Sequence, residues 1–143
     1  MKYKEEVRDL STVPNDYYFA HCISADFRMG EEFAVDFCLD MRLALLKKCP
    51  HYLNLWRSLK YDGDCILEGR VLNLITKERY WMKPTYRNLK AALSICAMTC
   101  KQNDIHKVAM PVIDRLQWDN ASAIIKETFA DMDIEILVCK REA

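Results

Sequence analysis

Glycine and proline are scarce in this chain, and their scarcity limits how it can be organised. The 143 residues include three glycines, at positions 30, 63 and 69, and four prolines. With so few chain-breaking residues there is no linker, low-complexity tract or internal repeat. A length of 143 residues suits one hydrophobic core and is short for two. We therefore expect a single domain that spans residues 1–143.

The sequence also lacks the marks of a membrane span and of a nucleic-acid-binding protein. Half of the residues are apolar (51%), yet no run approaches the 18 or so consecutive apolar residues of a spanning helix. Lysines and arginines number 21, as do aspartates and glutamates. Without a basic excess to neutralise phosphates, nucleic acid is not an expected partner, although a local basic patch is compatible with this balance.

The first residues and the cysteines favour a reducing compartment. Residues 1–7 are mixed in charge and strand-like, unlike a signal peptide, so we expect an intracellular protein of the cytoplasm, the nucleus or both. The seven cysteines are odd in number and mostly lie in apolar runs, which favours buried thiols over disulfides. Cys96 and Cys100 lie one helical turn apart, but no second Cys/His pair with zinc-ligand spacing follows. We predict neither a metal nor a cofactor.

Apolar periodicity predicts an α/β order of elements. Continuous or alternating apolar runs indicate strands at residues 2–7, 17–23, 65–67, 71–76, 107–113 and 134–139. Glu68-Gly69-Arg70 predicts a hairpin between two of them. Spacings of three and four indicate helices at residues 31–45, 51–59 and 84–103 (with Pro84 in the first turn) and from Asp119 or Asn120 onward. The inward positions of the last two helices are Leu89, Leu93, Cys96, Cys100, Ala121, Ile124, Ile125 and Phe129. Helices between strands imply parallel pairing in a layered architecture.

One stretch places an acid where α/β folds bind ligands. Residues 110–120 read Met-Pro-Val-Ile-Asp-Arg-Leu-Gln-Trp-Asp-Asn, so that Asp114 follows the carboxyl end of a strand and precedes an amphipathic helix. Four further blocks stand with it: Asp9-Leu10, residues 20–30, residues 74–79 and Lys83-Pro-Thr-Tyr86. In their order and approximate spacing these blocks resemble the macrodomain family, of the terminal ADP-ribose protein glycohydrolase type.

The resemblance implies a fold and a ligand. The fold would be a three-layer α/β/α macrodomain-like sandwich with a mixed, mostly parallel sheet. Expected partners are ADP-ribose or an ADP-ribosylated protein, and no oligomeric state is implied. The aspartate after the first strand would receive the adenine amino group, and residues 20–30 would form the ribose and diphosphate loop. The implied ligand-binding residues are Asp9, Leu10, Ser24, Arg28, Met29, Gly30, Pro111 and Leu116.

The resemblance also implies a catalytic pair, Lys77 and Asp114. Members of the family remove ADP-ribose from acidic side chains and deacylate O-acyl-ADP-ribose. Lys77 would match the lysine that attacks the anomeric carbon of the distal ribose. Asp114 would match the carboxylate that assists and then resolves the sugar–lysine adduct. A free lysine, with a pKa of about 10.4, is protonated and inert at neutral pH, and a carboxylate within reach can shuttle its proton.

Three features depart from the family pattern and leave activity open. Ile113 directly precedes Asp114, where family members carry roughly four more residues, a glycine-rich loop whose amides wrap the diphosphate. Glu31 and Glu32 follow at the other phosphate loop, and like charges about 5 Å apart repel by about 3 kcal/mol at an effective dielectric near 20. Arg8 stands where the family usually has glycine; it either hinders the loop or supplies a cation that partly offsets the acids.

Several other residues have two interpretations. His21 fits a core histidine better than a catalytic base, and Ser24 lacks the elbow motif of a serine hydrolase. Trp118 either frames the last helix or stacks on a sugar or base. Residues 80–82, Tyr-Trp-Met, form either the edge of the core or an exposed surface for a partner.

Two functions from different classes follow. In the first, the protein is an ADP-ribosyl hydrolase or O-acyl-ADP-ribose deacylase that works through Lys77 and Asp114. In the second, it is a catalytically impaired macrodomain that binds ADP-ribose weakly or uses its scaffold for protein contacts. Side chains of Lys77 and Asp114 that meet beside an open cleft would favour the first function. The lost glycines and added glutamates favour the second.

Overall fold

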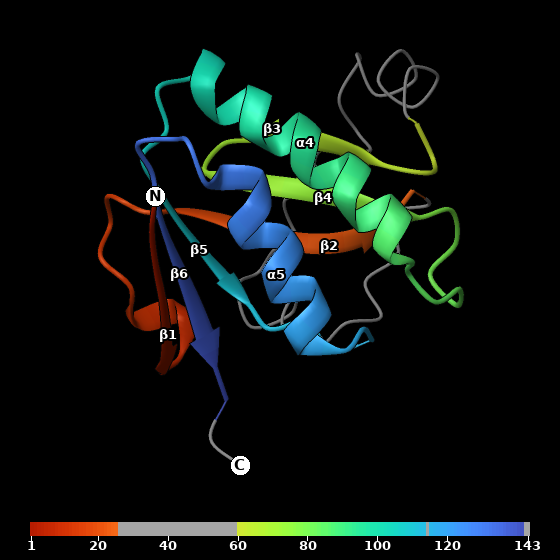
Figure 1. Cartoon of the computed structure of the whole chain (residues 1–143), viewed down its shortest axis with the longest axis horizontal. Helices are drawn as coiled ribbons and strands as arrows, with labels where there is room; N and C mark the ends of the chain where they lie inside the picture. Colours follow the sequence, from red (N-terminus) through yellow and green to blue (C-terminus); the bar gives the residue numbers. More distant parts are fainter. Residues whose placement is uncertain (26–59, 114, 142–143) are drawn as a thin grey trace.

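The computed structural model describes residues 1–25, 60–113 and 115–141. In this part of the chain six strands form one sheet, and two α-helices and a short 3-10 helix pack on it (Figure 1). The strands are β1 (Lys2–Val7), β2 (Tyr18–Ser24), β3 (Asp64–Glu68), β4 (Val71–Lys77), β5 (Lys107–Pro111) and β6 (Glu135–Lys140). The helices are η1 (Leu10–Thr12), α4 (Tyr86–Gln102) and α5 (Trp118–Phe129).

The sheet is mixed and mostly parallel, as predicted. Its strand order is β1-β6-β5-β2-β4-β3. Only the hairpin partners β3 and β4 are antiparallel within the described strands; every other neighbouring pair is parallel. The carboxyl ends of β1, β6, β5, β2 and β4 therefore lie along one edge of the sheet, here named the carboxyl edge. Open α/β folds bind ligands outside such an edge.

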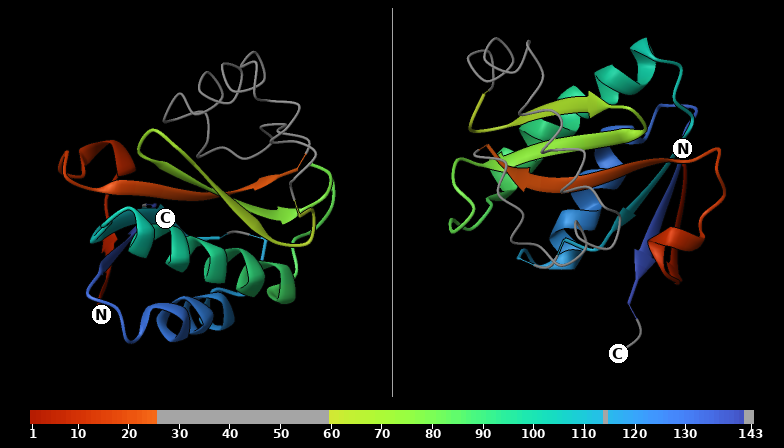
Figure 2. Two further views of the ribbon diagram at one scale, coloured as in Figure 1. Left: turned by 90° about the horizontal axis from the view of Figure 1, so that it is seen from above. Right: turned by 180° about the vertical axis from the view of Figure 1, so that it is seen from behind.

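Helices α4 and α5 lie side by side on one face of the sheet (Figure 2). Leu89, Leu93, Cys96 and Cys100 of α4 recur at spacings of four, three and four, and all four are buried against the sheet, as predicted. In α5, Ile125 and Phe129 are buried and Ile124 is half-buried against the same core. Each fully buried side chain of this size contributes about 1.5–3 kcal/mol of transfer free energy, so this packing holds the two helices on the sheet.

A smaller apolar cluster covers part of the opposite face. Alternation along β5 and β6 turns Val108 and Val138 toward α4 and α5, and turns Ala109 and Leu137 the other way. Leu10, Val13, Tyr17 and Cys139 complete the second cluster. The Tyr17 hydroxyl also donates a hydrogen bond to the Glu135 carboxylate of β6. Residues 10–17, which include η1, are thereby held against β5 and β6.

The two helix starts differ from the predictions. Thr85 caps α4, because its Oγ1 accepts a hydrogen bond from the Asn88 amide at 3.1 Å, so Pro84 precedes the helix and does not form its first turn. The predicted cap of α5 at Asp119 or Asn120 is wrong, since the helix begins at Trp118 with Gln117 in the cap position. The Gln117 amide donates to the Tyr86 hydroxyl at 3.0 Å, a partner from the other helix that local sequence does not reveal.

Two glycines occupy positions that other residues would strain. Gly69, with φ of 58°, is the first residue of the two-residue turn between β3 and β4, which confirms the predicted hairpin. Gly63 has φ of 148°, and a Cβ there would lie 2.4 Å from the Ala91 Cβ of α4. The start of β3 can thus approach α4 closely.

All six strands were predicted, and each predicted end lies within about two residues of the observed end. Asn103 caps the end of α4, as expected. The helices predicted at residues 31–45 and 51–59 lie outside the described residues. Neither of the described helices combines the length and the apolar character needed to cross a bilayer.

Candidate functional site

Lys77 and Ser24 meet at the carboxyl edge. Each is the last residue of its strand, β4 and β2 respectively, and the two are register partners. The Ala25 amide donates to the Lys77 carbonyl at 2.9 Å, which extends the pairing by one residue. Both residues are buried: Lys77 is 6% exposed and Ser24 is 1% exposed. A lysine so little exposed at a strand end is restrained in position, unlike an ordinary solvated lysine.

Pro111 extends this group by one strand. It is the last residue of β5, which pairs with β2 on one side and β6 on the other. Three predicted site residues therefore end three neighbouring strands, β5, β2 and β4. The other residue of the predicted catalytic pair, Asp114, lies outside the described residues, as do Arg28, Met29 and Gly30. The pairing of Lys77 with Asp114 stays a prediction.

Asp9 begins the turn that follows β1 at the same edge. Its Oδ1 accepts hydrogen bonds from the Ser11 amide and the Ser11 hydroxyl, both at 2.8 Å. These bonds, first the one from the amide, hold the pKa of the Asp9 carboxyl below its usual value. An ionised carboxylate offers about four acceptor positions, so two bonds to Oδ1 leave capacity for a ligand amine. The adjacent Leu10 side chain is buried in the second cluster. The contact between Asp9 and the adenine amino group stays a prediction.

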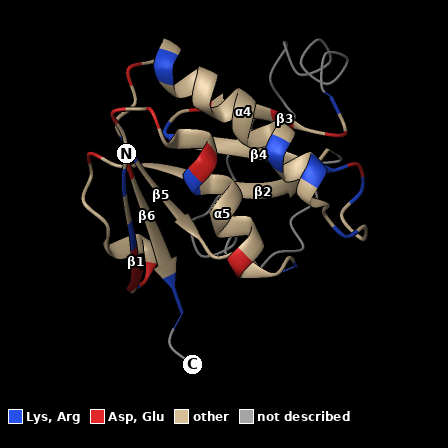
Figure 3. Ribbon diagram, viewed as in Figure 1, with Lys and Arg blue, Asp and Glu red and all other residues tan. Residues whose placement is uncertain are grey.

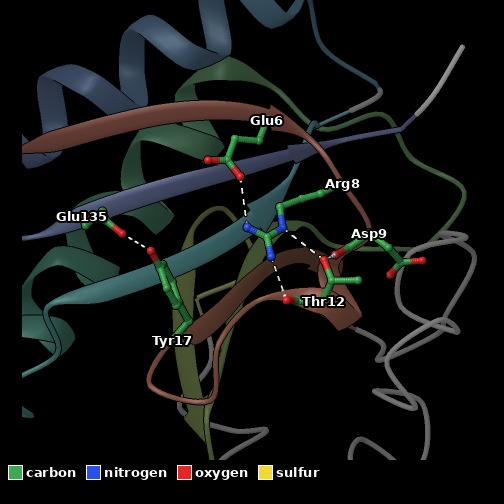
Figure 4. A network of polar contacts seen from close by, with 6 residues as sticks. All are labelled: Glu6, Arg8, Asp9, Thr12, Tyr17 and Glu135. Carbon is green, nitrogen blue, oxygen red and sulfur yellow. Dashed lines mark hydrogen bonds and ion pairs between the residues drawn. The ribbon is translucent and has the colours of Figure 1, made fainter.

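The side chain of Arg8 is held within the turn (Figure 4). Its Nη1 donates to Glu6 at 3.0 Å, and its Nε and Nη2 donate to the hydroxyl and carbonyl oxygens of Thr12 at 3.1 and 2.8 Å. The guanidinium therefore joins the end of β1 to the end of η1. Sequence left open whether Arg8 hinders the loop or supplies a cation; the structure shows a third role, in which it stabilises the turn.

Three aromatic or imidazole side chains resolve alternatives left by the sequence. His21 is buried in β2 and donates from Nε2 to Asn73 Oδ1 at 2.5 Å; burial lowers its pKa to about 4, so it is a neutral core histidine. Trp118 is half-buried and packs against the main core, with Nε1 donating to Glu5 at 3.1 Å. It frames α5. Trp81, in contrast, is 67% exposed, which favours the surface interpretation of residues 80–82.

The described cysteines are free thiols; Cys96, Cys100 and Cys139 are buried, as predicted, and Cys22 and Cys65 are half-buried. Hydrogen bonds with Cys100 and Cys65, together with burial, hold the pKa of Cys96 well above its usual value. Such a thiol is a weak nucleophile. In residues 1–25, 60–113 and 115–141, no three His, Cys, Asp or Glu side chains are grouped as a metal would require.

A pocket that the sequence did not predict opens where α4 and α5 begin. Its volume is about 490 Å³, and it is lined by residues 83–86 together with Leu116, Gln117 and Asn120. The Tyr86 hydroxyl accepts from the Gln117 amide and, at 3.4 Å, from Asn120 Nδ2, so it joins the two helix starts. Leu116 is the predicted ligand-binding residue in this lining. The other lining residues were not predicted to bind a ligand, although all of them lie within the motif blocks at residues 83–86 and 110–120.

The architecture is that of a macrodomain. The macrodomain of Mycobacterium tuberculosis DarG superposes with a TM-score of 0.76 at 14% identity, over 99% of this chain and 98% of that one. No family model matches the chain. Curated relatives are closer in sequence. The chain is 39% identical over 138 residues to the ADP-ribose glycohydrolase OARD1 of Homo sapiens. The matched residues cover 91% of this chain and 86% of that protein. OARD1 of Bos taurus matches to the same extent. The chain belongs to the macrodomain family, and its predicted fold class is confirmed.

Proposed function

We propose that this protein binds ADP-ribose and hydrolyses the bond between the distal ribose and an acyl group, either a glutamate or aspartate side chain or a small acyl ester. The observation that carries the proposal is the 39% identity, over 91% of the chain, to a protein named as an ADP-ribose glycohydrolase. The position of Lys77 supports it. A buried lysine at the end of an inner strand, beside Ser24, is where an open α/β fold would present a nucleophile to a ligand.

In the proposed reaction Lys77 is the nucleophile and Asp114 the acid–base group. The Lys77 nitrogen attacks the anomeric carbon, the bond from that carbon to the acyl oxygen breaks, and the carboxylate leaves. Asp114 takes the proton that the nitrogen loses and passes it to the departing carboxylate, which leaves as the free acid. The ionised aspartate then removes a proton from water, the hydroxide adds to the anomeric carbon as the bond to the Lys77 nitrogen breaks, and the aspartic acid returns the proton to that nitrogen, which releases ADP-ribose and restores the lysine. Burial of Lys77 restrains the amine and keeps bulk water from the point of attack.

The proposed ligand contacts follow the edge from β1 to β4. Asp9 accepts the adenine amino group with the acceptor capacity that its bonds to Ser11 leave. Ser24 and Pro111 lie beneath the sugar and diphosphate, at the ends of the two central strands. Leu116 supplies an apolar contact at one end, and Leu10, whose side chain is buried in the second cluster, holds the Asp9 turn in place at the other. Arg28, Met29 and Gly30 are assigned to the diphosphate loop from the family resemblance alone.

Two sequence observations favour a second candidate, a macrodomain that binds but does not hydrolyse. Ile113 abuts Asp114, so the amides that wrap a diphosphate in the family are fewer here, and Glu31 and Glu32 add negative charge. Replacing both acids (Glu31→Ala with Glu32→Gly) would then tighten ADP-ribose binding. Unchanged affinity would remove the electrostatic basis of this candidate.

One experiment separates the two candidates. ADP-ribose is titrated into the protein by calorimetry, and the protein is then incubated with a glutamate-linked mono-ADP-ribosylated protein. We expect a binding isotherm and release of ADP-ribose by the natural chain, and no release by Lys77→Ala. Binding without release would support the impaired macrodomain. A titration without heat at millimolar ligand would contradict both candidates.

A further inference from the structure

The pocket between the starts of α4 and α5 is lined by residues that are close in sequence to Lys77 and Asp114, the proposed reaction centre. Residues 78–85 run from Lys77, the last residue of β4, to the start of α4. On the other rim, Leu116 follows the position of Asp114 by two residues. Arg115 Nη1 donates to the Met82 carbonyl at 3.3 Å and so links the two rims. Asn88, near the start of α4, donates from Nδ2 to the Thr76 carbonyl of β4 at 3.1 Å, so the start of α4 lies against the end of the strand that Lys77 terminates. We expect the protein part of a substrate whose anomeric carbon sits at Lys77 to extend toward this pocket.

The rim formed by the β4–α4 segment is basic. Residues 77–90 contain five lysines and arginines and one acid, Glu78, in a chain whose formal net charge is zero. Figure 3 shows this positive charge along the loop before α4 and on the first turns of the helix. Arg79, Lys83 and Arg87 are exposed. Asp119, in the first turn of α5, is the acid on the opposite rim.

The same rim exposes aromatic surface. Trp81 is 67% exposed and Tyr80 is 42% exposed, directly between Arg79 and Lys83. Tryptophan, tyrosine and arginine are the side chains most enriched where proteins bind one another. Thr85, Gln117 and Asn120 add hydroxyl and amide groups to the pocket lining. The surface therefore combines cations, hydrogen-bonding groups and two exposed rings.

From this combination we infer that Arg79, Trp81, Lys83, Arg87, Gln117 and Asn120 form an acceptor surface, which docks an acidic peptide segment of the protein that carries the ADP-ribose. The inference deepens the proposed function, because the acids that flank a modified glutamate would contact this surface while the sugar lies at Lys77. Lys83 and Arg87 pair with the flanking carboxylates, Gln117 and Asn120 donate to them, and Trp81 covers the peptide backbone.

An acidic peptide fits this surface better than a nucleic acid does. Exposed cations bind carboxylates and phosphates alike, but affinity for a nucleic acid grows with the number of phosphates neutralised. Only a few cations gather here, Glu78 and Asp119 flank them, and the remainder of the chain supplies no basic excess. A short segment with two or three carboxylates matches this limited charge.

Binding is tested first without any chemistry. A fluorescein-labelled decapeptide of alternating glutamate and glycine is titrated with the full chain, in low salt and saturating ADP-ribose, and anisotropy is recorded. We expect saturable binding that Lys83→Glu weakens about tenfold, as a change of about 1.4 kcal/mol would. Trp81→Ala weakens it to a lesser extent. Lys101→Glu is the matched control, since Lys101 is exposed in the last turn of the same helix, and it should change affinity less than twofold.

Hydrolysis then connects the surface to the reaction. For an ADP-ribosylated peptide with acidic flanks, Lys83→Glu should raise KM and leave kcat unchanged. The same variant should hydrolyse O-acetyl-ADP-ribose, which has no peptide, at the rate of the natural chain. If the natural chain hydrolyses neither substrate, the proposed function is wrong, and the anisotropy titration still decides the docking inference.

Three results would overturn the inference. The first is an acidic peptide that causes no anisotropy change at millimolar protein. The second is a loss with Lys101→Glu equal to that with Lys83→Glu, which would indicate unspecific charge attraction. In the third, a single-stranded oligonucleotide binds with the same dependence on Lys83 and Trp81 while the peptide does not, and the surface would then belong to nucleic acid.

Discussion

The turn after β1 and the segment after β4 leave the same edge of the sheet, yet they use their charged side chains in opposite ways. After β1, Arg8 contacts Glu6 and Thr12, and Asp9 accepts two bonds from Ser11. The polar groups bind within the turn itself. After β4, residues 78–85 carry exposed cations and an exposed tryptophan, and residues 83–85 line a pocket.

This difference separates stability from binding. Hydrogen bonds made inside a turn stabilise the folded state, by about 1 kcal/mol each when partly shielded. Exposed side chains contribute little to folding and remain accessible to a partner. We therefore expect substitutions near β1 to change unfolding free energy, and substitutions near β4 to change activity and binding.

The largest contrast should come from two lysines at strand ends. Lys77 ends β4, and Lys140 ends β6, where its ammonium contacts Glu5 at 2.7 Å. Lys77→Met should lower the rate of ADP-ribosyl-glutamate hydrolysis by about a thousandfold or more, because no other group replaces the nucleophile. Lys140→Met should lower stability slightly and leave the rate within about threefold, as expected for a partly exposed ion pair. Single-turnover rates and urea unfolding measure both effects. Equal rate losses for the two variants would contradict the assignment of Lys77.

As the pH is lowered, the protein should lose the stabilisation from His21 between β2 and β4 before it loses that from Glu5 in β1. His21 of β2 donates to Asn73 of β4, and burial lowers its pKa from 6.5 to about 4. Between these values the unfolded chain binds more protons than the folded one, so unfolding free energy falls as the pH falls from 6.5 to 4, by about 3 kcal/mol in total. Glu5, whose pKa is lowered to about 2, chiefly by the bond from Lys140, keeps its stabilisation above pH 4.5 and loses it only toward pH 2.

The check is a comparison of the natural chain with His21→Gln, which lacks the titrating ring. Unfolding free energies from guanidinium titrations at pH 7.5, 5.5 and 4 should show the natural chain losing stability relative to the variant. Curves that run parallel over this pH range would show that His21 is not the group responsible.

Much of the fold was predictable because it follows from local periodicity. The stripe of Leu89, Leu93, Cys96 and Cys100 identified α4, and Gly69 identified the hairpin. Such patterns record which face of an element is buried, and they need no knowledge of the partner element. The parallel order of the sheet followed from helices between strands.

The helix starts and the pocket were not predictable for a physical reason. α5 begins at Trp118 because the Gln117 amide donates to the Tyr86 hydroxyl, a contact between residues 31 positions apart. The pocket exists because α4 and α5 begin at the same edge. The hydrogen bonds of Arg8 depend on the position of Thr12 at the end of η1. Each feature depends on contacts between separate elements, and motif resemblance located Lys77 and Ser24 without showing that they are register partners.

A matched pair of arginines sharpens the comparison of the two segments. Arg8→Met removes three hydrogen bonds from the turn after β1 and should lower unfolding free energy by about 1–2 kcal/mol, since the guanidinium is only partly exposed. Arg79→Met removes an exposed cation after β4 and should change stability by less than about 0.5 kcal/mol. Urea unfolding of both variants provides the measurement. A loss for Arg79→Met as large as that for Arg8→Met would remove the distinction between the segments.

The smallest effect is expected from a pair of tryptophans replaced by phenylalanine. Trp118→Phe keeps most of the ring packing but removes the bond from Nε1 to Glu5, so a loss of about 1 kcal/mol is expected. Trp81→Phe keeps an aromatic ring on a side chain that is 67% exposed, so unfolding free energy should change by less than about 0.5 kcal/mol. The acceptor surface should still bind acidic peptide through that ring, with affinity lowered only a few fold. Urea unfolding and peptide anisotropy on the same preparations measure both quantities. If Trp81→Phe destabilised the chain more than Trp118→Phe, the segment after β4 would be part of the folded core, and its exposed residues would no longer be explained by a partner.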